Sequence, residues 1–238
     1  MATATVDKKS GTRHGVLSNF ALKQTMAVTG IIFVGFVAVH LFGNLKVYSG
    51  ADAFNHYAVW LREVGYPFVP KKSVLWALRI VLAGSLLLHV GAAITLWSRG
   101  RMSRGRHRRR LRGYHPRAAA FMLPGGLLIL AFVLVHISDL TLGGPLASES
   151  FRHPDPDMHA YANLVASFSR PWMALFYALV MVVIGLHIEH GWRTLLQDLG
   201  ATGRRFRQVW AAIGGLLALA IVAGNALIPL LVLAGVIR

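Results

Sequence analysis

The sequence contains no cysteine. This excludes disulfide bonds, thiol nucleophiles and any iron–sulfur cluster ligated by this chain alone. A redox centre in this protein must therefore depend on histidine ligands or on a partner subunit.

Charge is also scarce, and acidic residues most of all. The chain has 9 Asp and Glu against 25 Lys and Arg, so its formal net charge is +16. Charged residues make up only 14% of the sequence and apolar residues 55%, and the mean hydropathy is +0.54. Few soluble domains combine these values, so the composition predicts an integral membrane protein.

Apolar runs long enough to cross about 30 Å of hydrocarbon as helices occur five times. They cover residues 22–46, 73–97, 118–142, 171–193 and 207–236. We therefore expect an all-α integral membrane protein with one five-helix transmembrane domain over residues 22–238, preceded by a basic cytoplasmic arm over residues 1–21. No cleavable signal peptide is expected, because the first apolar run is too long for one.

The basic residues lie in alternate connections. The segment "SRGRMSRGRHRRRLRGYHPR", residues 98–117, is the densest cluster, and the N-terminal arm and the connection between the last two runs are basic too. The positive-inside rule then places the N-terminus in the cytoplasm and the C-terminus outside, in the cytoplasmic membrane of a bacterium. Basic loops this close to a membrane indicate orientation, contact with anionic lipid and docking of a soluble partner, and no nucleic acid is expected as a partner.

Histidines occur inside four of the apolar runs, as His40, His89, His136 and His187. Successive helices run in opposite directions, so the membrane face at which each helix starts alternates along the chain. Counted from that start, each histidine lies about 24–27 Å along its own helix. His40 and His136 are thereby predicted near the outer surface, and His89 and His187 near the cytoplasm. The two layers should be roughly 15–20 Å apart.

Ionisable side chains in transmembrane helices are costly and are functional candidates. A single such histidine could be a core side chain hydrogen-bonded to a carbonyl, but four at two matched depths favour a cofactor. Paired imidazoles on facing helices suit the axial ligation of haem iron, so we expect a histidine-bearing four-helix bundle that holds two haems. The alternative cofactor is a [2Fe–2S] cluster with His89 and His187 from this chain and cysteines from a partner.

Other polar residues give weaker site predictions. Arg79, Asn44 and Asp139 mark an outer polar site, where Arg79 could snorkel, pair with Asp139 or meet a haem propionate. A quinone site is expected at the cytoplasmic end. The residues proposed for it are Lys23, Thr25, Glu189, His190 and Trp192.

Aromatic residues follow two patterns. Residues 49–65, "SGADAFNHYAVWLREVG", are typical of an amphipathic helix on the outer surface. Its expected buried side consists of Phe54, Tyr57, Trp60 and Leu61. The residues expected in the aromatic belts of the membrane interfaces are Trp76, Trp97, Trp172, Trp192 and Tyr177.

Short motifs in register with the four histidines resemble a known family. They are "VHLFGN", "GADAFN", "LLLHVGAA", "FVLVHISD", "DMHAYANLVASFSRPWMALFY" and "GLHIEHG". Over roughly residues 22–200 the chain resembles the single-subunit, five-helix, di-haem cytochrome b anchor of succinate dehydrogenases and fumarate reductases, respiratory complex II. The arginine-rich connection 98–117 and His190 depart from that pattern.

The resemblance implies that His40 and His136 ligate a distal haem b, and His89 and His187 a proximal one. It further implies the membrane subunit of a succinate:quinone oxidoreductase, which carries electrons between a cytoplasmic iron–sulfur subunit and membrane quinone. The dicarboxylate chemistry would belong to a flavoprotein subunit. A cofactor-free structural anchor and a membrane transporter are the alternative functions, although the midplane polar sites and inverted repeats typical of transporters are not evident in the sequence.

Overall fold

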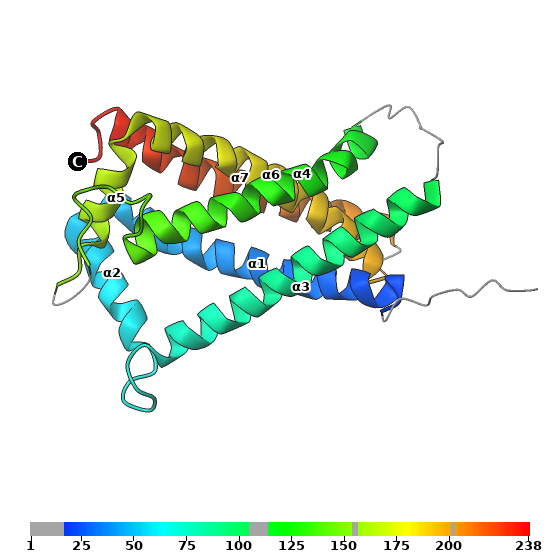
Figure 1. Cartoon of the computed structure of the whole chain (residues 1–238), viewed down its shortest axis with the longest axis horizontal. Coiled ribbons are helices and arrows are strands. Elements are labelled where there is room, and N and C mark those ends of the chain that lie inside the picture. The colour runs from blue at the N-terminus through cyan, green and yellow to red at the C-terminus, as the bar shows by residue number, and fades with distance from the viewer. Residues whose placement is uncertain (1–16, 105–113, 154–156, 201–202) are drawn as a thin grey trace, which may run out of the picture.

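The computed structural model describes residues 17–104, 114–153, 157–200 and 203–238. Within these ranges, five helices are long and apolar enough to cross a membrane, which confirms the five expected spans (Figure 1). They are α1 (Asn19–Asn44), α3 (Ser73–Arg104), α4 (Tyr114–His136), α6 (Pro171–Asp198) and α7 (Arg204–Leu233). The chain thus has the architecture of a multi-pass membrane protein.

The helix ends follow local chemistry more closely than hydropathy. At the start of α1, the side chain of Ser18 accepts a hydrogen bond of 3.1 Å from the backbone N–H of Ala21, an N-cap that replaces a missing helical partner. After α1 the chain continues as the 3₁₀ helix η1 (Leu45–Ser49) and turns at Gly50, whose φ of 93° suits glycine. The helix α3 extends beyond its apolar run to Arg104.

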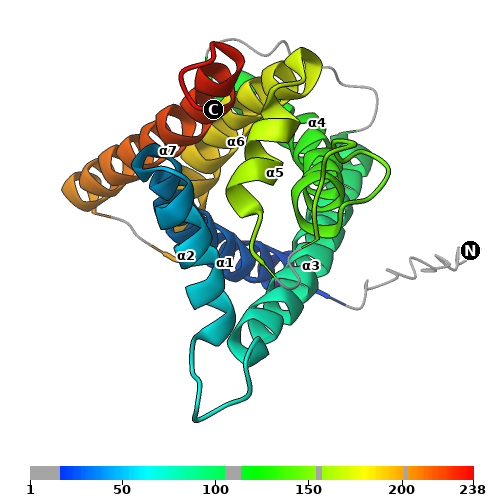
Figure 2. The same ribbon diagram turned by 90° about the vertical axis from the view of Figure 1, so that its left-hand side faces the viewer.

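Helices α1, α3, α4 and α6 stand around a common axis, and α7 lies outside them against α6 and α1 (Figure 2). The helix α6 is central, since 44% of its most apolar stretch is buried, against 11% in α3 and in α4. The remaining apolar surface of α3 and α4 suits contact with lipid. The helix α7 packs on α6 and α1, and 28% of its most apolar stretch is buried, more than in α3 or α4.

The two ends of the bundle differ in character. At one end, α1 and α7 begin and α3 and α6 finish, while α2, α5 and the C-terminus lie at the opposite end (Figure 1). We call these the basic end and the α2 end. The arginine-rich connection joins α3 to α4 at the basic end, although its residues 105–113, like residues 1–16 of the basic arm, lie outside the described ranges. Which end faces the cytoplasm stays a prediction from charge.

Two shorter helices cover the α2 end. The helix α2 (Ala51–Glu63) is the amphipathic helix predicted over residues 49–65. Its Phe54, Tyr57 and Leu61 are half-buried as expected, but Trp60 is 56% exposed, so its assignment to the buried side was wrong. The helix α5 (Ala160–Phe168), which hydropathy alone did not predict, buries Phe168 in the main hydrophobic core, against α6 and α7.

Candidate functional site

The histidines of the four bundle helices meet in two pairs. The ring centroids of His40 on α1 and His136 on α4 are 5.9 Å apart, with their planes at 86°. Those of His89 on α3 and His187 on α6 are 6.4 Å apart, with their planes at 55°. These are the pairings that helix depth predicted. Their role as ligands stays a prediction.

The separation of the two pairs follows from helix rise. On α1, Thr29 contacts His89 and lies 11 residues before His40, which corresponds to about 16 Å along the axis. On α6, Tyr177 contacts His136 and lies 10 residues before His187, about 15 Å along the axis. Both helices therefore separate the pairs by the same distance, within the range expected from the sequence.

A buried threonine hydroxyl contacts the ring of His89. The hydroxyl of Thr29, which is 3% exposed, lies 2.7 Å from the carbonyl oxygen of Thr25 and 2.9 Å from Nδ1 of His89. A hydroxyl has one proton, so if it donates to the carbonyl it accepts from the Nδ1–H of His89. This arrangement leaves Nε2 of His89 with its lone pair, the form in which imidazole binds a metal.

His187 lies close to Gly126 of the opposite helix. A Cβ on Gly126 of α4 would lie 3.4 Å from Cε1 of His187, an ordinary van der Waals contact. Within the described ranges, the buried Nδ1 of His187 has no hydrogen-bond partner. A buried polar atom of this kind is costly unless a bound group or water satisfies it.

His136 is attached to a buried polar cluster. The hydroxyl of Tyr177 lies 3.4 Å from Nδ1 of His136 and donates to Oδ2 of Asp139 at 3.1 Å. Asp139 is 1% exposed, and it also accepts hydrogen bonds from Ser167 at 2.5 Å and from the guanidinium of Arg170 at 2.6 Å. We call Asp139, Ser167, Arg170 and Tyr177 the Asp139 cluster. Its carboxylate is thereby paired and fully hydrogen-bonded inside the membrane-spanning region.

The backbone around Asp139 is irregular. After His136 the chain widens into the π-helix η2 (Ile137–Leu142), which ends at Gly143 with a φ of 65°. Single π-helical turns occur frequently at functional sites. This one places Asp139 where it meets side chains of α5 and α6.

The cluster corrects two expectations. Tyr177 is 4% exposed and hydrogen-bonded, so its assignment to an aromatic belt was wrong. The suggested pair of Arg79 with Asp139 does not form, because Asp139 pairs with Arg170 and the guanidinium of Arg79 stacks on Trp76 at 4.9 Å. The sequence did contain a signal for the true partner, since an aspartate in an apolar run needs a nearby cation and Arg170 directly precedes the next run.

The remaining residue of the expected outer polar site has its own partner. The side-chain amide of Asn44 donates to Oδ1 of Asn225 on α7 at 2.7 Å. Arg79 contacts Trp76, Asn44 contacts Asn225 and Asp139 contacts Arg170. The three residues of the expected outer polar site therefore have different partners.

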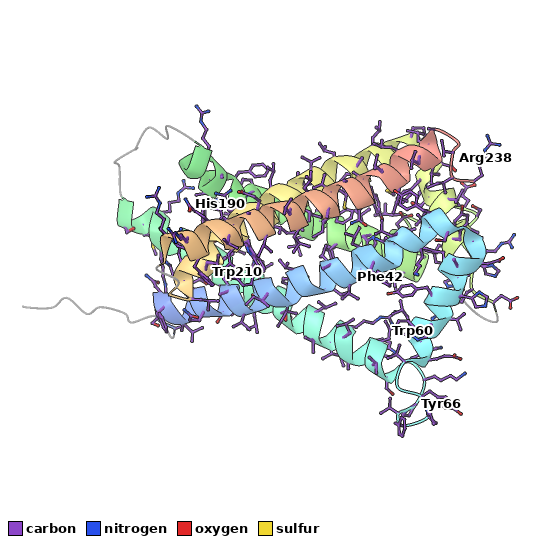
Figure 3. The ribbon with its side chains drawn as sticks, turned by 180° about the vertical axis from the view of Figure 1, so that it is seen from behind. Phe42, Trp60, Tyr66, His190, Trp210 and Arg238 are labelled. Carbon is purple, nitrogen blue, oxygen red and sulfur yellow. The ribbon has the colours of Figure 1, made fainter. Side chains whose placement is uncertain are left out.

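The residues predicted for the quinone site divide between two helices. On α6, Glu189 pairs with Arg193, and the indole N–H of Trp192 donates to the carbonyl of Trp210 at 3.0 Å. His190, on the same helix, is 9% exposed. His190 and Trp210 both lie toward the basic end, far from Trp60 (Figure 3).

On α1, the predicted quinone residues adjoin a cavity. Lys23 forms an ion pair of 2.9 Å with Asp198 at the end of α6, and this pair joins α1 to α6. Thr25 lines an open cavity of about 350 Å³ between α1 and α3. The other residues of its wall are Gln24, Val28, Thr29 and Leu88. Of the residues predicted for the quinone site, only Thr25 lines this cavity, and the quinone site stays a prediction.

Each histidine pair has the ring spacing that two imidazole ligands of one haem iron would have. Two imidazoles on opposite sides of one metal ion, each bonded at about 2 Å, have ring centroids about 6 Å apart, and the two pairs measure 5.9 and 6.4 Å. The rings also keep accessible surface, since His40 is exposed and His89, His136 and His187 are half-buried. Among the described residues, no group of three or more His, Asp or Glu could hold a metal ion. A haem needs only two protein ligands, because the porphyrin supplies four.

The chain was also compared with known proteins. No family model, no curated protein and no solved structure matches it.

Proposed function

We propose that this chain is the membrane subunit of a succinate:quinone oxidoreductase, in which it carries electrons between an iron–sulfur subunit and membrane quinone. The observation that carries the proposal is the presence of two facing histidine pairs, about 16 Å apart along α1, with the centroid spacing that axial ligation requires. The resemblance of the sequence to di-haem cytochrome b anchors supplies the substrate and the partner subunits.

The residues of the bundle have distinct tasks in this proposal. His40 and His136 hold the distal haem, and His89 and His187 hold the proximal haem. When bound, haem b supplies a one-electron carrier at each position. The hydroxyl of Thr29 orients the ring of His89. The apolar walls of the bundle exclude water from the site.

The basic end is the cytoplasmic side in this proposal and binds the iron–sulfur subunit, which in turn carries the flavoprotein subunit. Arg204, Arg205 and Arg207 at the start of α7 are exposed at this end. They favour a partner with an acidic surface and contact with anionic lipid headgroups. The histidine pair nearer this end, His89 with His187, is then the first to receive electrons from the partner.

Quinone binds in the cavity between α1 and α3. The wall of this cavity is almost entirely apolar, which suits the ring and tail of a quinone, and the hydroxyls of Thr25 and Thr29 donate to carbonyls of α1 and can accept a hydrogen bond from a quinol. Thr29 both lines the cavity and contacts Nδ1 of His89 at 2.9 Å. A quinone in the cavity is therefore separated from the proximal ligand by a single side chain.

Substituting Thr25 with Val tests the quinone position. The change preserves shape and removes a hydroxyl oxygen that donates to the carbonyl of Ala21 and can accept from a quinol, so the KM for quinol should rise several-fold while the haem spectrum stays unchanged. Thr141→Val, at an exposed threonine of η2 near the α2 end, is the matched control and should leave the KM unchanged. An unaltered KM in Thr25→Val and in a Gln24→Leu variant would exclude this cavity and direct attention to Asn44 at the other end.

An absorption spectrum of the purified complex tests the function as a whole. We expect a reducible b-type band that corresponds to two haems per chain. Absence of haem together with a Rieske-type electron paramagnetic resonance signal would favour the [2Fe–2S] alternative. Absence of both signals would refute the redox proposal and leave a cofactor-free anchor or a transporter.

A further inference from the structure

We propose that the Asp139 cluster sets the reduction potential of the centre held by His40 and His136, by pulling electron density onto His136 through Tyr177. The proposal rests on the proposed function, because it concerns the properties of a haem held by that pair. It makes Tyr177 and Asp139 positioning residues that act on the iron through its ligand.

The first step of the argument is the charge on Asp139. Its carboxylate accepts hydrogen bonds from Ser167, Tyr177 and Arg170 at 2.5, 3.1 and 2.6 Å, and it is almost fully buried. The carboxylate is ion-paired with the guanidinium of Arg170, and it lies two hydrogen bonds from the imidazole of His136, through the hydroxyl of Tyr177.

The second step is the direction of the hydrogen bonds. Tyr177 has one hydroxyl proton, which it donates to Asp139. Its oxygen then accepts from the Nδ1–H of His136, at a distance of 3.4 Å that is long for such a bond. A hydrogen-bond acceptor behind a ligating imidazole makes the imidazole a stronger donor to the metal, and an acceptor bonded to a carboxylate does so more. The oxidised form of the iron gains most from this, so the potential falls.

The third step is a comparison with the other pair. The hydroxyl that contacts Nδ1 of His89 belongs to Thr29, and it donates a hydrogen bond to the neutral backbone carbonyl of Thr25. No carboxylate takes part in that arrangement within the described residues. The two pairs thus have the same kind of ligand, a histidine imidazole, and differ in the groups that contact the Nδ1 atoms. This difference gives the protein a means of setting two different reduction potentials.

The variant Tyr177→Phe isolates this effect. The ring of Tyr177 packs against Phe168 and Phe132 at centroid distances of 4.9 and 5.0 Å, and a phenylalanine ring keeps that packing. Asp139 retains its bonds to Ser167 and Arg170. The contact with His136 and the hydrogen bond from Tyr177 to Asp139 are lost together.

The test is a spectroelectrochemical measurement of both haem potentials in the purified complex. In Tyr177→Phe, one of the two potentials should rise by about 59 mV, a tenfold change in the ratio of oxidised to reduced form, and the other should stay constant. In Thr29→Val, the other potential should rise, by a smaller amount. Tyr161→Phe removes a hydroxyl from α5, where the ring packs on Phe54, and should change neither potential.

The outcomes separate this inference from the proposed function. A wild-type complex without haem overturns both. Two haems whose potentials are unchanged in Tyr177→Phe, or change equally, overturn the inference and leave the proposed function intact. If Tyr177→Phe fails to assemble, Asp139→Asn takes its place, because it keeps the side-chain shape and removes the charge. An unchanged potential in that variant also overturns the inference.

Discussion

At the scale of single residues, the four imidazoles differ in the side chains that contact them. His89 contacts a threonine hydroxyl and His136 a tyrosine hydroxyl, each through Nδ1. His40 stacks on Phe36 with a centroid distance of 5.3 Å, and the Nδ1 of His187 is buried without a partner among the described residues. Within the described residues, each pair thus combines one imidazole whose Nδ1 contacts a hydroxyl with one that has no such contact.

Substitution of single histidines tests the pairing. His89→Ala and His187→Ala should each remove the same haem, because the loss of one axial ligand opens the iron and leaves a cavity. About half of the haem absorbance should remain, with the spectrum and potential of the other centre. His40→Ala and His136→Ala should give the complementary spectrum.

The control for these variants is His56→Ala. His56 lies on α2, where it is exposed and contacts the carbonyl of Asp52, and its loss should leave both haems in place. Different residual spectra in His89→Ala and His187→Ala would contradict the pairing. Loss of all haem in either variant would contradict the independence of the two centres.

At the scale of helices, α6 depends on close packing against α7. A Cβ on Gly185 of α6 would collide with the side chain of Val222 on α7. Association of helices in lipid relies on such close approach of small residues, because lipid tails are as apolar as the helices themselves. The contact positions α6, which carries His187 and Tyr177 and thus serves both pairs.

Gly185→Ala should therefore destabilise the protein by about 1–3 kcal/mol, since the packed helices must separate or Val222 must move. The matched variant is Gly84→Ala on α3, where no neighbouring atom lies within 4 Å of the added Cβ. That change should be neutral or should stabilise the helix by up to about 1 kcal/mol. Thermal melting in detergent measures both variants. Equal melting temperatures would show that the α6–α7 contact is not limiting.

At the scale of the whole molecule, charge and helix direction predict the orientation in the membrane. The natural chain has no cysteine, so one introduced cysteine gives an unambiguous label. Ser103 at the basic end and Ser150 at the α2 end are both exposed. With Ser103→Cys, a membrane-impermeant maleimide should react only from the cytoplasmic side, and with Ser150→Cys only from outside. Reversed labelling would invert the order of the two histidine pairs relative to the partner subunit.

The sequence alone determined the class of fold and the number of membrane spans. Long apolar runs in water or lipid have few alternatives to a helix, because each backbone polar group needs a partner within its own segment. The positions of four histidines along these helices then predicted which rings lie at equal depth, since the rise per residue is constant. The structure brings together His40 with His136 and His89 with His187 as the depths required.

The tertiary structure decided which side chains contact those histidine rings. Hydropathy gives depth along a helix and says little about the direction in which a side chain points, so Tyr177 was assigned to the lipid interface and Asp139 was considered as one possible partner of Arg79. The rotation of α6 and the π-helical turn after His136 instead direct Tyr177 and Asp139 toward each other, with Arg170 as the partner. A buried carboxylate in lipid can exist only beside its donors, and those donors come from segments that are 28 to 38 residues away in the sequence.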